Sequence, residues 1–167
     1  MATQPQPVLK EGDPAPDFSL PASTGRTVSL SEFRDKRVVV LYFYPKDDTP
    51  GCTIEACGFR DMVKEYERVG AAILGVSLDN LHSHTKFVDK FSLPFPLLSD
   101  ENQTVSRAYG VYTLKQMYGK EYWGIERTTF LIDTHGTILK IYPKVKVDDH
   151  HHQVMRCLPS NIWLTCS

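Results

Sequence analysis

The run Val38–Tyr44 (VVVLYFY) constrains the fold of this chain more than any other segment. All its residues are β-branched, leucine or aromatic, and none is a charged or amide residue that would mark a side facing solvent. A strand of this kind is buried on both faces, as in the centre of a sheet covered by other layers. The run is too short to span a bilayer. It therefore predicts an α/β fold built around one central strand.

The segments around this strand alternate between helix-like and strand-like patterns. A helix is predicted after Thr49, since Thr49 suits an N-cap, Pro50 the first helical position and Gly70 the C-cap. Further strands are predicted at 26–30, 71–78, 95–98, 127–133 and 137–142, and further helices at 31–33, 80–91 and 102–109. The order β-α-β-α-β-α-β-β indicates a three-layer α/β sandwich with a mixed sheet, for which a thioredoxin-like arrangement is a natural solution.

Composition narrows the classes of protein and partner. The 167 residues suit a single domain, with residues 1–11 expected as a loose arm and 150–167 as a polar tail. The net charge of -1, with Lys and Arg spread along the chain, argues against nucleic acid or membrane as a main partner. The N-terminus lacks the apolar run of a signal peptide, so we expect a cytoplasmic protein, or a plastid protein whose transit peptide has been removed.

Four cysteines, at positions 52, 57, 157 and 166, are too few for a disulfide scaffold. The spacing of Cys52 and Cys57 is C-x4-C, which suits neither a zinc finger nor the C-x2-C pair of disulfide oxidoreductases. We expect no metal or cofactor. Cys157 and Cys166 could be free, pair with each other, or link two molecules.

Cys52 falls in the first turn of the predicted helix, directly after the central strand. Functional sites form beyond the carboxyl ends of strands in open α/β sheets. The free backbone N–H groups and the dipole of a helix start favour an anion, and so favour a reactive thiolate. The alternative is a buried structural cysteine. The helix-start position, the adjacent Pro50 and Gly51, and the second cysteine favour the reactive one.

A thiolate at this position needs a cation nearby. Asp47 and Asp48 would oppose it by like-charge repulsion. Arg127, at the start of a predicted core strand, is the best candidate for a group that stabilises the thiolate and polarises an oxygen of the substrate.

Cys57 lies five residues after Cys52 in the same predicted helix. Ideal helix geometry places the two Cα atoms roughly 8.6 Å apart. A disulfide needs Cα atoms within about 7 Å, so the pair can bond only if the first turns unwind. The pair is then a redox switch, unless Cys57 merely packs on the inward face.

These residues resemble the peroxiredoxins. Pro45–Cys52 (PKDDTPGC) is similar to their peroxidatic motif, and the C-x4-C pair is typical of the PrxQ, or bacterioferritin comigratory protein, subgroup. The resemblance covers about residues 10–150, including Gly12–Phe18 (GDPAPDF) and Ile125–Asp133 (IERTTFLID). It implies a thioredoxin-like fold and reduction of hydrogen peroxide and organic hydroperoxides, with thioredoxin or a glutaredoxin-like protein as reductant.

The resemblance also implies residue roles. Cys52 is the peroxidatic cysteine, which becomes a sulfenic acid, and Cys57 is the resolving cysteine, which condenses with it. Thr49 bonds the peroxide and the thiolate, Pro45 shields the site from water, and Arg127 supplies the cation. Glu55 is similar to an acid that orients this arginine, although an exposed helix charge is an alternative. Because the resolving cysteine is on the same chain, we expect a monomer.

Two other functions remain open at this level. A general disulfide oxidoreductase on the same fold is disfavoured by the C-x4-C spacing and by Thr49. A redox-sensing or binding protein would use the Cys52–Cys57 switch as a signal.

The histidines, the C-terminal segment and two aromatic residues carry further expectations. His82 and His84 are expected as solvated histidines, and His150–His152 as a polar helix start that could bind a metal adventitiously. A final helix is expected after Asp149, although the sequence 159–161 breaks its pattern. Tyr122 and Trp123 are expected either to line an apolar mouth of the site or simply to pack.

Overall fold

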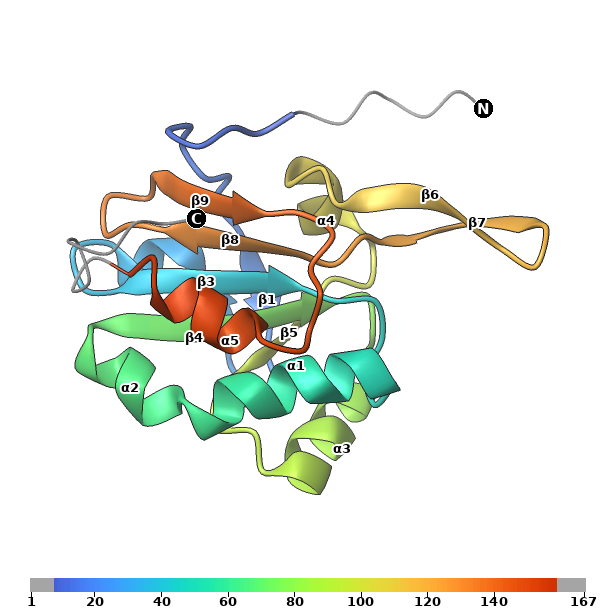
Figure 1. Cartoon of the computed structure of the whole chain (residues 1–167), viewed down its shortest axis with the longest axis horizontal. Coiled ribbons are helices and arrows are strands. Elements are labelled where there is room, and N and C mark those ends of the chain that lie inside the picture. The colour runs from blue at the N-terminus through green and yellow to red at the C-terminus, as the bar shows by residue number, and fades with distance from the viewer. Residues whose placement is uncertain (1–7, 159–167) are drawn as a thin grey trace.

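The computed structural model describes residues 8–158, and Figure 1 shows the arrangement of its elements. A five-stranded mixed sheet with the order β5-β4-β3-β8-β9 forms its centre. The strands are β3 (Val38–Phe43), β4 (Ala71–Ser77), β5 (Leu97–Ser99), β8 (Thr128–Ile132) and β9 (Ile138–Tyr142). β3, β4 and β5 are parallel, whereas β8 and β9 are joined antiparallel. The predicted α/β fold with a mixed sheet is confirmed.

Strand β3 lies at the centre of this sheet, and all of its residues are buried. Val39, Leu41 and Phe43 belong to the apolar cluster on one face of the sheet. Val38, Val40 and Tyr42 belong to the cluster on the other face. This alternation is the reason for the unbroken apolar run, because each face of the strand packs against a separate layer.

Helices cover the face on which Cys52 lies. They are α1 (Pro50–Asp61), α2 (Val63–Arg68), α3 (Leu81–Phe91) and α5 (His150–Met155), grouped on one side of the sheet in Figure 1. The opposite cluster receives residues of β1 (Ser19–Pro21), β2 (Thr27–Ser29), the 3-10 helix η1 (Leu30–Phe33) and α4 (Thr104–Ala108). The sheet is therefore buried on both faces, as the sequence predicts.

The helix predicted from Thr49 to Gly70 is divided in two. Met62 leaves helical geometry with ψ of 9°, and its N–H donates to the carbonyl of Phe59, three residues back. Helix α2 then ends at Arg68, with Val69 as its C-cap, and Gly70 follows with a φ of +79°. Gly70 thus occupies the left-handed position after a helix, as expected.

A hairpin that was not predicted from the sequence projects from the body of the molecule in Figure 1. It consists of β6 (Tyr112–Met117) and β7 (Lys120–Ile125), paired antiparallel around Tyr118 and Gly119. Both turn residues have positive φ, 53° and 76°. The two-residue turn containing glycine was the available signal. β7 ends two residues before Arg127, so the hairpin leads directly to this residue.

The two ends of the described chain contact the body. The described part of the expected loose arm is attached to β9, since the Glu11 carboxylate accepts from the Ile141 N–H at 3.1 Å. At the other end the expected final helix begins at His150 as α5. Cys157 packs at the edge of the helix-covered cluster. Cys166 and positions 159–161 lie outside the described residues. Within residues 8–158, no helix has the length and apolar character to cross a membrane.

Candidate active site

Cys52 is the third residue of α1, beyond the carboxyl end of β3, and is only 1% exposed. Thr49 is the N-cap residue and Pro50 starts the helix, as predicted. The Thr49 side chain does not cap the helix, because its hydroxyl donates to the carbonyl of Lys46 at 2.9 Å. Pro45 lies half-buried at the start of the same loop. The predicted strand–loop–helix setting of Cys52 is therefore present.

Arg127 is the cation at this thiol. Its Nη2 donates to the Cys52 sulfur at 3.2 Å, and its Nη1 donates to Glu55 Oε1 at 2.7 Å. The Glu55 side chain is fully buried, so the alternative of an exposed helix charge is wrong. One guanidinium thus bridges two residues of the first turns of α1, which orients it toward the sulfur.

Gly51 allows this approach. A Cβ atom at Gly51 would lie 3.1 Å from Arg127 Nη2, closer than side chains normally pack. The absence of a side chain at this position therefore has a steric reason that sequence spacing alone does not show.

Burial shifts the pKa of the Glu55 carboxyl, which lies beside Arg127. Burial raises the pKa of Glu55 to about 7, although the charge of Arg127 and its hydrogen bond act in the opposite direction. Glu55 Oε2 has no hydrogen-bond partner among the described residues. The carboxyl therefore exchanges its proton near neutral pH, beside the arginine that contacts the thiol.

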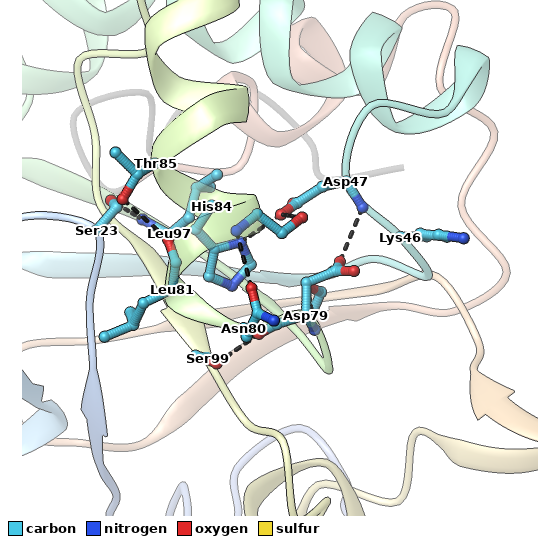
Figure 2. A network of polar contacts seen from close by, with 12 residues as sticks. Ser23, Lys46, Asp47, Asp79, Asn80, Leu81, His84, Thr85, Leu97 and Ser99 are labelled. Atoms are coloured by element: carbon cyan, nitrogen blue, oxygen red, sulfur yellow. Dashed lines mark hydrogen bonds and ion pairs between the residues drawn. The ribbon is translucent and has the colours of Figure 1, made fainter.

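Asp47 and Asp48, the two carboxylates expected to oppose the thiolate, each contact a basic side chain of α3. Asp48 Oδ2 lies 2.8 Å from Lys90 Nζ on α3. Asp47 turns inward, and its Oδ2 lies 2.7 Å from His84 Nδ1 (Figure 2). Both carboxylates therefore have partners other than the groups that contact the sulfur.

His84 is fully buried, so the expectation of a solvated histidine is wrong at this position, whereas His82 is exposed as expected. The physical reason is the helix period: His84 and Phe87 lie three residues apart on the inward face of α3, and His82 points outward. The sequence contained this signal, because Phe87 marks the buried face.

Cys57 is a free thiol, as is Cys52, and both lie within the uninterrupted helix α1. Helix α5 packs beside this segment. A Cβ atom at Gly58 would come within 2.4 Å of His151 Nδ1, so glycine is required for this close contact. Tyr66 of α2 also donates to the His151 carbonyl at 2.6 Å. α5 therefore rests on the helix that carries both cysteines.

The three histidines of α5 have different surroundings. His150 is buried, with Nε2 2.7 Å from Thr129 Oγ1. Burial lowers its pKa to about 4. His151 and His152 lie with Asp149 so that one ligand atom of each is within 4.8 Å of the others. The polar helix start is thus confirmed for the last two, but not for His150.

The projecting hairpin contributes one further group. Burial and the charge of Arg127 lower the pKa of Lys115 on β6. Trp123 stacks on Tyr112 within the hairpin, with ring centroids 5.5 Å apart, and Tyr122 is 41% exposed. Lys115 was missed because the hairpin itself was missed.

Comparison with known proteins places this geometry in a family. The AhpC/TSA family matches residues 11–141. A putative peroxiredoxin Bcp of Coxiella burnetii is 51% identical over 147 residues, which cover 88% of this chain and 97% of the relative. Peroxiredoxin Bcp of Bacillus subtilis is 49% identical over 150 residues, covering 90% and 95%.

Solved structures agree with these relatives. Xanthomonas campestris peroxiredoxin Q matches with a TM-score of 0.81 at 41% identity, covering 86% of this chain and 90% of the other. A cysteine-to-serine mutant of Xylella fastidiosa PrxQ matches with a TM-score of 0.87 at 34% identity, covering 93% and 99%. Another match is the Xanthomonas campestris bacterioferritin comigratory protein, studied for its alkyl peroxide reduction activity. The predicted thioredoxin-like fold is confirmed by these neighbours.

Proposed function

Because the chain belongs to the AhpC/TSA family and is a peroxiredoxin, a thiol peroxidase that acts on hydroperoxides, we propose that Cys52 is its peroxidatic cysteine. The contact of Arg127 Nη2 with the Cys52 sulfur at 3.2 Å carries the proposal. The cation stabilises the thiolate, which is the nucleophilic form of cysteine. The free backbone N–H groups at the helix start also favour a negative charge on the sulfur.

In the first step the Cys52 thiolate attacks one peroxide oxygen in line, and the O–O bond breaks. Water or an alcohol leaves after taking up a proton, and the cysteine becomes a sulfenic acid. Arg127 and the N–H groups of the first turn stabilise the charge that develops on the leaving oxygen. Because the Thr49 hydroxyl proton is used by the Lys46 carbonyl, its oxygen is the acceptor for the peroxide O–H. Pro45 keeps water from the sulfur.

In the second step the Cys57 thiol displaces water from the sulfenic acid and forms a disulfide. Both cysteines lie in the continuous helix α1, so the first turns of α1 must unwind for this step. Thioredoxin, or a glutaredoxin-like protein, then reduces the disulfide by thiol exchange. Glu55 orients Arg127 during the first step. An intramolecular disulfide needs no partner chain, which supports a monomer.

The test is peroxide-dependent oxidation of NADPH in the presence of thioredoxin and its reductase. Cys52→Ser should abolish turnover, and full activity in this variant would overturn the proposal. Cys57→Ser should still form one sulfenic acid per chain, detected by dimedone labelling and mass spectrometry, but should not turn over with thioredoxin. Retained turnover in Cys57→Ser would exclude its resolving role and leave Cys157 or Cys166 to be tested.

A further inference from the structure

A buried polar network joins the loop that precedes Cys52 to α3 and to the ends of β4 and β5 (Figure 2). Asp47 is its centre: its carboxylate accepts from the Tyr44 hydroxyl at 2.6 Å and from the Ser83 hydroxyl at 2.8 Å. His84 Nδ1 lies 2.7 Å from the same carboxylate. Asp47 is 7% exposed and His84 is completely buried, so solvent contributes little to either group.

The backbone of the loop is attached to the same network. The N–H of Asp47 donates to Asp79 Oδ2 at 2.8 Å. This oxygen also accepts from the Ser77 hydroxyl at 2.7 Å, and the Ser99 hydroxyl donates to the Asp79 carbonyl. Asp47 is therefore held through both its backbone and its side chain, by groups of α3 and of the loops that follow β3 and β4.

The partners of His84 determine its charge. Nε2 lies 3.0 Å from the carbonyl oxygen of Leu98, and Nδ1 faces the carboxylate of Asp47. A carbonyl oxygen and an ionised carboxylate can only accept hydrogen bonds. These two acceptors favour a His84 that donates from both nitrogens, which is an imidazolium paired with Asp47. His84 Nδ1, Asp47 Oδ2 and Asp79 Oδ2 already take part in hydrogen bonds. We therefore interpret the cluster of Asp47, Asp79 and His84 as a charge network rather than a metal site.

The position of this pair in the chain gives it a role in the reaction. Asp47 lies between Pro45 and Thr49, two residues of the proposed site. Asp48 follows in the left-handed region, with φ of +56°, a conformation that surrounding contacts must hold. Within residues 8–158, the hydrogen-bond partners of the Asp47 side chain and N–H come from α3 and from the loops after β3 and β4, and none is on α1. The loop can therefore keep its position while α1 unwinds and re-forms.

We propose that His84 is a positioning residue of the peroxidase. Its buried charge holds Asp47, and Asp47 holds the loop so that Pro45 and Thr49 face the peroxide in every cycle. This inference rests on the proposed function of Cys52. We call the pair of His84 and Asp47 the anchor of the loop. Its histidine lies on α3, outside the segment that carries the two cysteines.

The charge state can be tested directly on the wild-type protein. In ¹⁵N-histidine-labelled protein at pH 7, His84 should show two ring N–H protons, both shifted downfield and slow to exchange. The assignment uses the loss of these signals in a His84 variant. A single ring N–H on His84 would overturn the ion pair.

Two variants separate the contacts of His84. In His84→Asn the amide nitrogen can replace Nδ1 and donate to Asp47, whereas in His84→Gln it can replace Nε2 and donate to Leu98. Both are neutral, so the loss of charge is common to them. In single-turnover experiments with hydrogen peroxide, oxidation of Cys52 should be at least fivefold slower in His84→Gln than in His84→Asn. Equal rates, or the reverse order, would overturn the positioning role.

Ser83→Ala provides a milder variant, with Thr85→Ala as its matched control on the same helix. The Ser83 hydroxyl bonds Asp47, whereas the exposed Thr85 hydroxyl bonds the Leu81 carbonyl within α3. Ser83→Ala should slow Cys52 oxidation about threefold, and Thr85→Ala should leave it unchanged. Equal rates in the two would count against the anchor even if the His84 variants fail to fold.

Two further measurements identify the origin of any effect. Loss of the anchor should slow the oxidation of Cys52 and leave the rate of Cys52–Cys57 disulfide formation unchanged. General destabilisation would instead accelerate disulfide formation by easing the unwinding of α1, and that result would overturn the inference. Cys52→Ser is run in parallel: turnover in that variant refutes the proposed function itself, whereas an inactive Cys52→Ser with equal His84 variants refutes only the anchor.

Discussion

The guanidinium of Arg127 donates to the sulfur of Cys52 across 3.2 Å, although the two residues are 75 positions apart in the chain. β8 lies next to β3 in the sheet, and this pairing brings the residue before β8 to the helix after β3. The same side chain bonds Glu55, one turn further along α1. The contact between this guanidinium and the thiol therefore depends on the register of two strands as well as on the position of Cys52 at the helix start.

Arg127→Lys tests the two hydrogen bonds that the guanidinium donates, to the Cys52 sulfur and to Glu55. An ammonium is a single point of charge and cannot donate in parallel to the sulfur and to Glu55 as a guanidinium does. We expect the second-order rate constant of Cys52 oxidation to fall about 100-fold, the typical effect of losing one oriented donor. The measurement is stopped-flow oxidation by hydrogen peroxide. Arg107→Lys, a guanidinium over the Tyr112 ring, is the control, and a wild-type rate in Arg127→Lys would contradict the assigned role.

Gly51→Ala tests the steric reason for glycine at this position. The added methyl would meet Arg127 Nη2 at 3.1 Å and displace the guanidinium from the sulfur. Alanine is a better helix former than glycine, so stability should not fall with activity. We expect Cys52 oxidation to slow about tenfold with an unchanged or higher midpoint of urea unfolding. Thr53→Ala, two residues on, should match the wild type in both assays.

Glu55 predicts one component of the pH dependence of stability. Burial raises its pKa in the folded state to about 7, from an ordinary value of 4.5. Between these values the folded protein binds a proton that the unfolded chain has lost, so this contribution to stability falls as pH rises. From pH 5 to pH 7 the wild type should lose about 2 kcal/mol relative to Glu55→Gln, measured by urea unfolding. Parallel pH profiles of the two proteins would contradict this prediction.

The lowered pKa of His150 predicts a contribution to stability that changes with pH in the opposite direction. Burial lowers its pKa in the folded state to about 4, from 6.5. Between these values the unfolded chain binds the additional proton, so stability rises with pH and is lost on acidification below about 6.5. Relative to His150→Gln, the wild type should gain about 2 kcal/mol from pH 5 to pH 7.

The two components nearly cancel in the wild type, so the two variants are best compared with each other. The unfolding free energy of Glu55→Gln minus that of His150→Gln should increase steadily from pH 5 to pH 7. A difference that is flat with pH, or that decreases, would show that these two buried groups do not titrate as their burial implies.

The central part of the site could be predicted because its information is local. The apolar run Val38–Tyr44 and the helix start at Thr49 fix the strand, the turn and the position of Cys52 by short-range patterns. Arg127 could be chosen because it opens a predicted core strand. The exposed hairpin was missed because its two strands present no buried apolar face and pack mainly on each other.

By itself, the sequence determined the α/β order, the central strand, the position of Cys52 in the first turn of a helix and its C-x4-C spacing to Cys57. Only the tertiary structure decided the charges around that thiol. Asp47 was expected to oppose the thiolate, but His84, 37 residues away, turns it inward. Glu55 could be an exposed charge until Arg127 was placed against it. Local patterns report which side of an element is buried, whereas the partner of a buried charge depends on which elements the fold brings together.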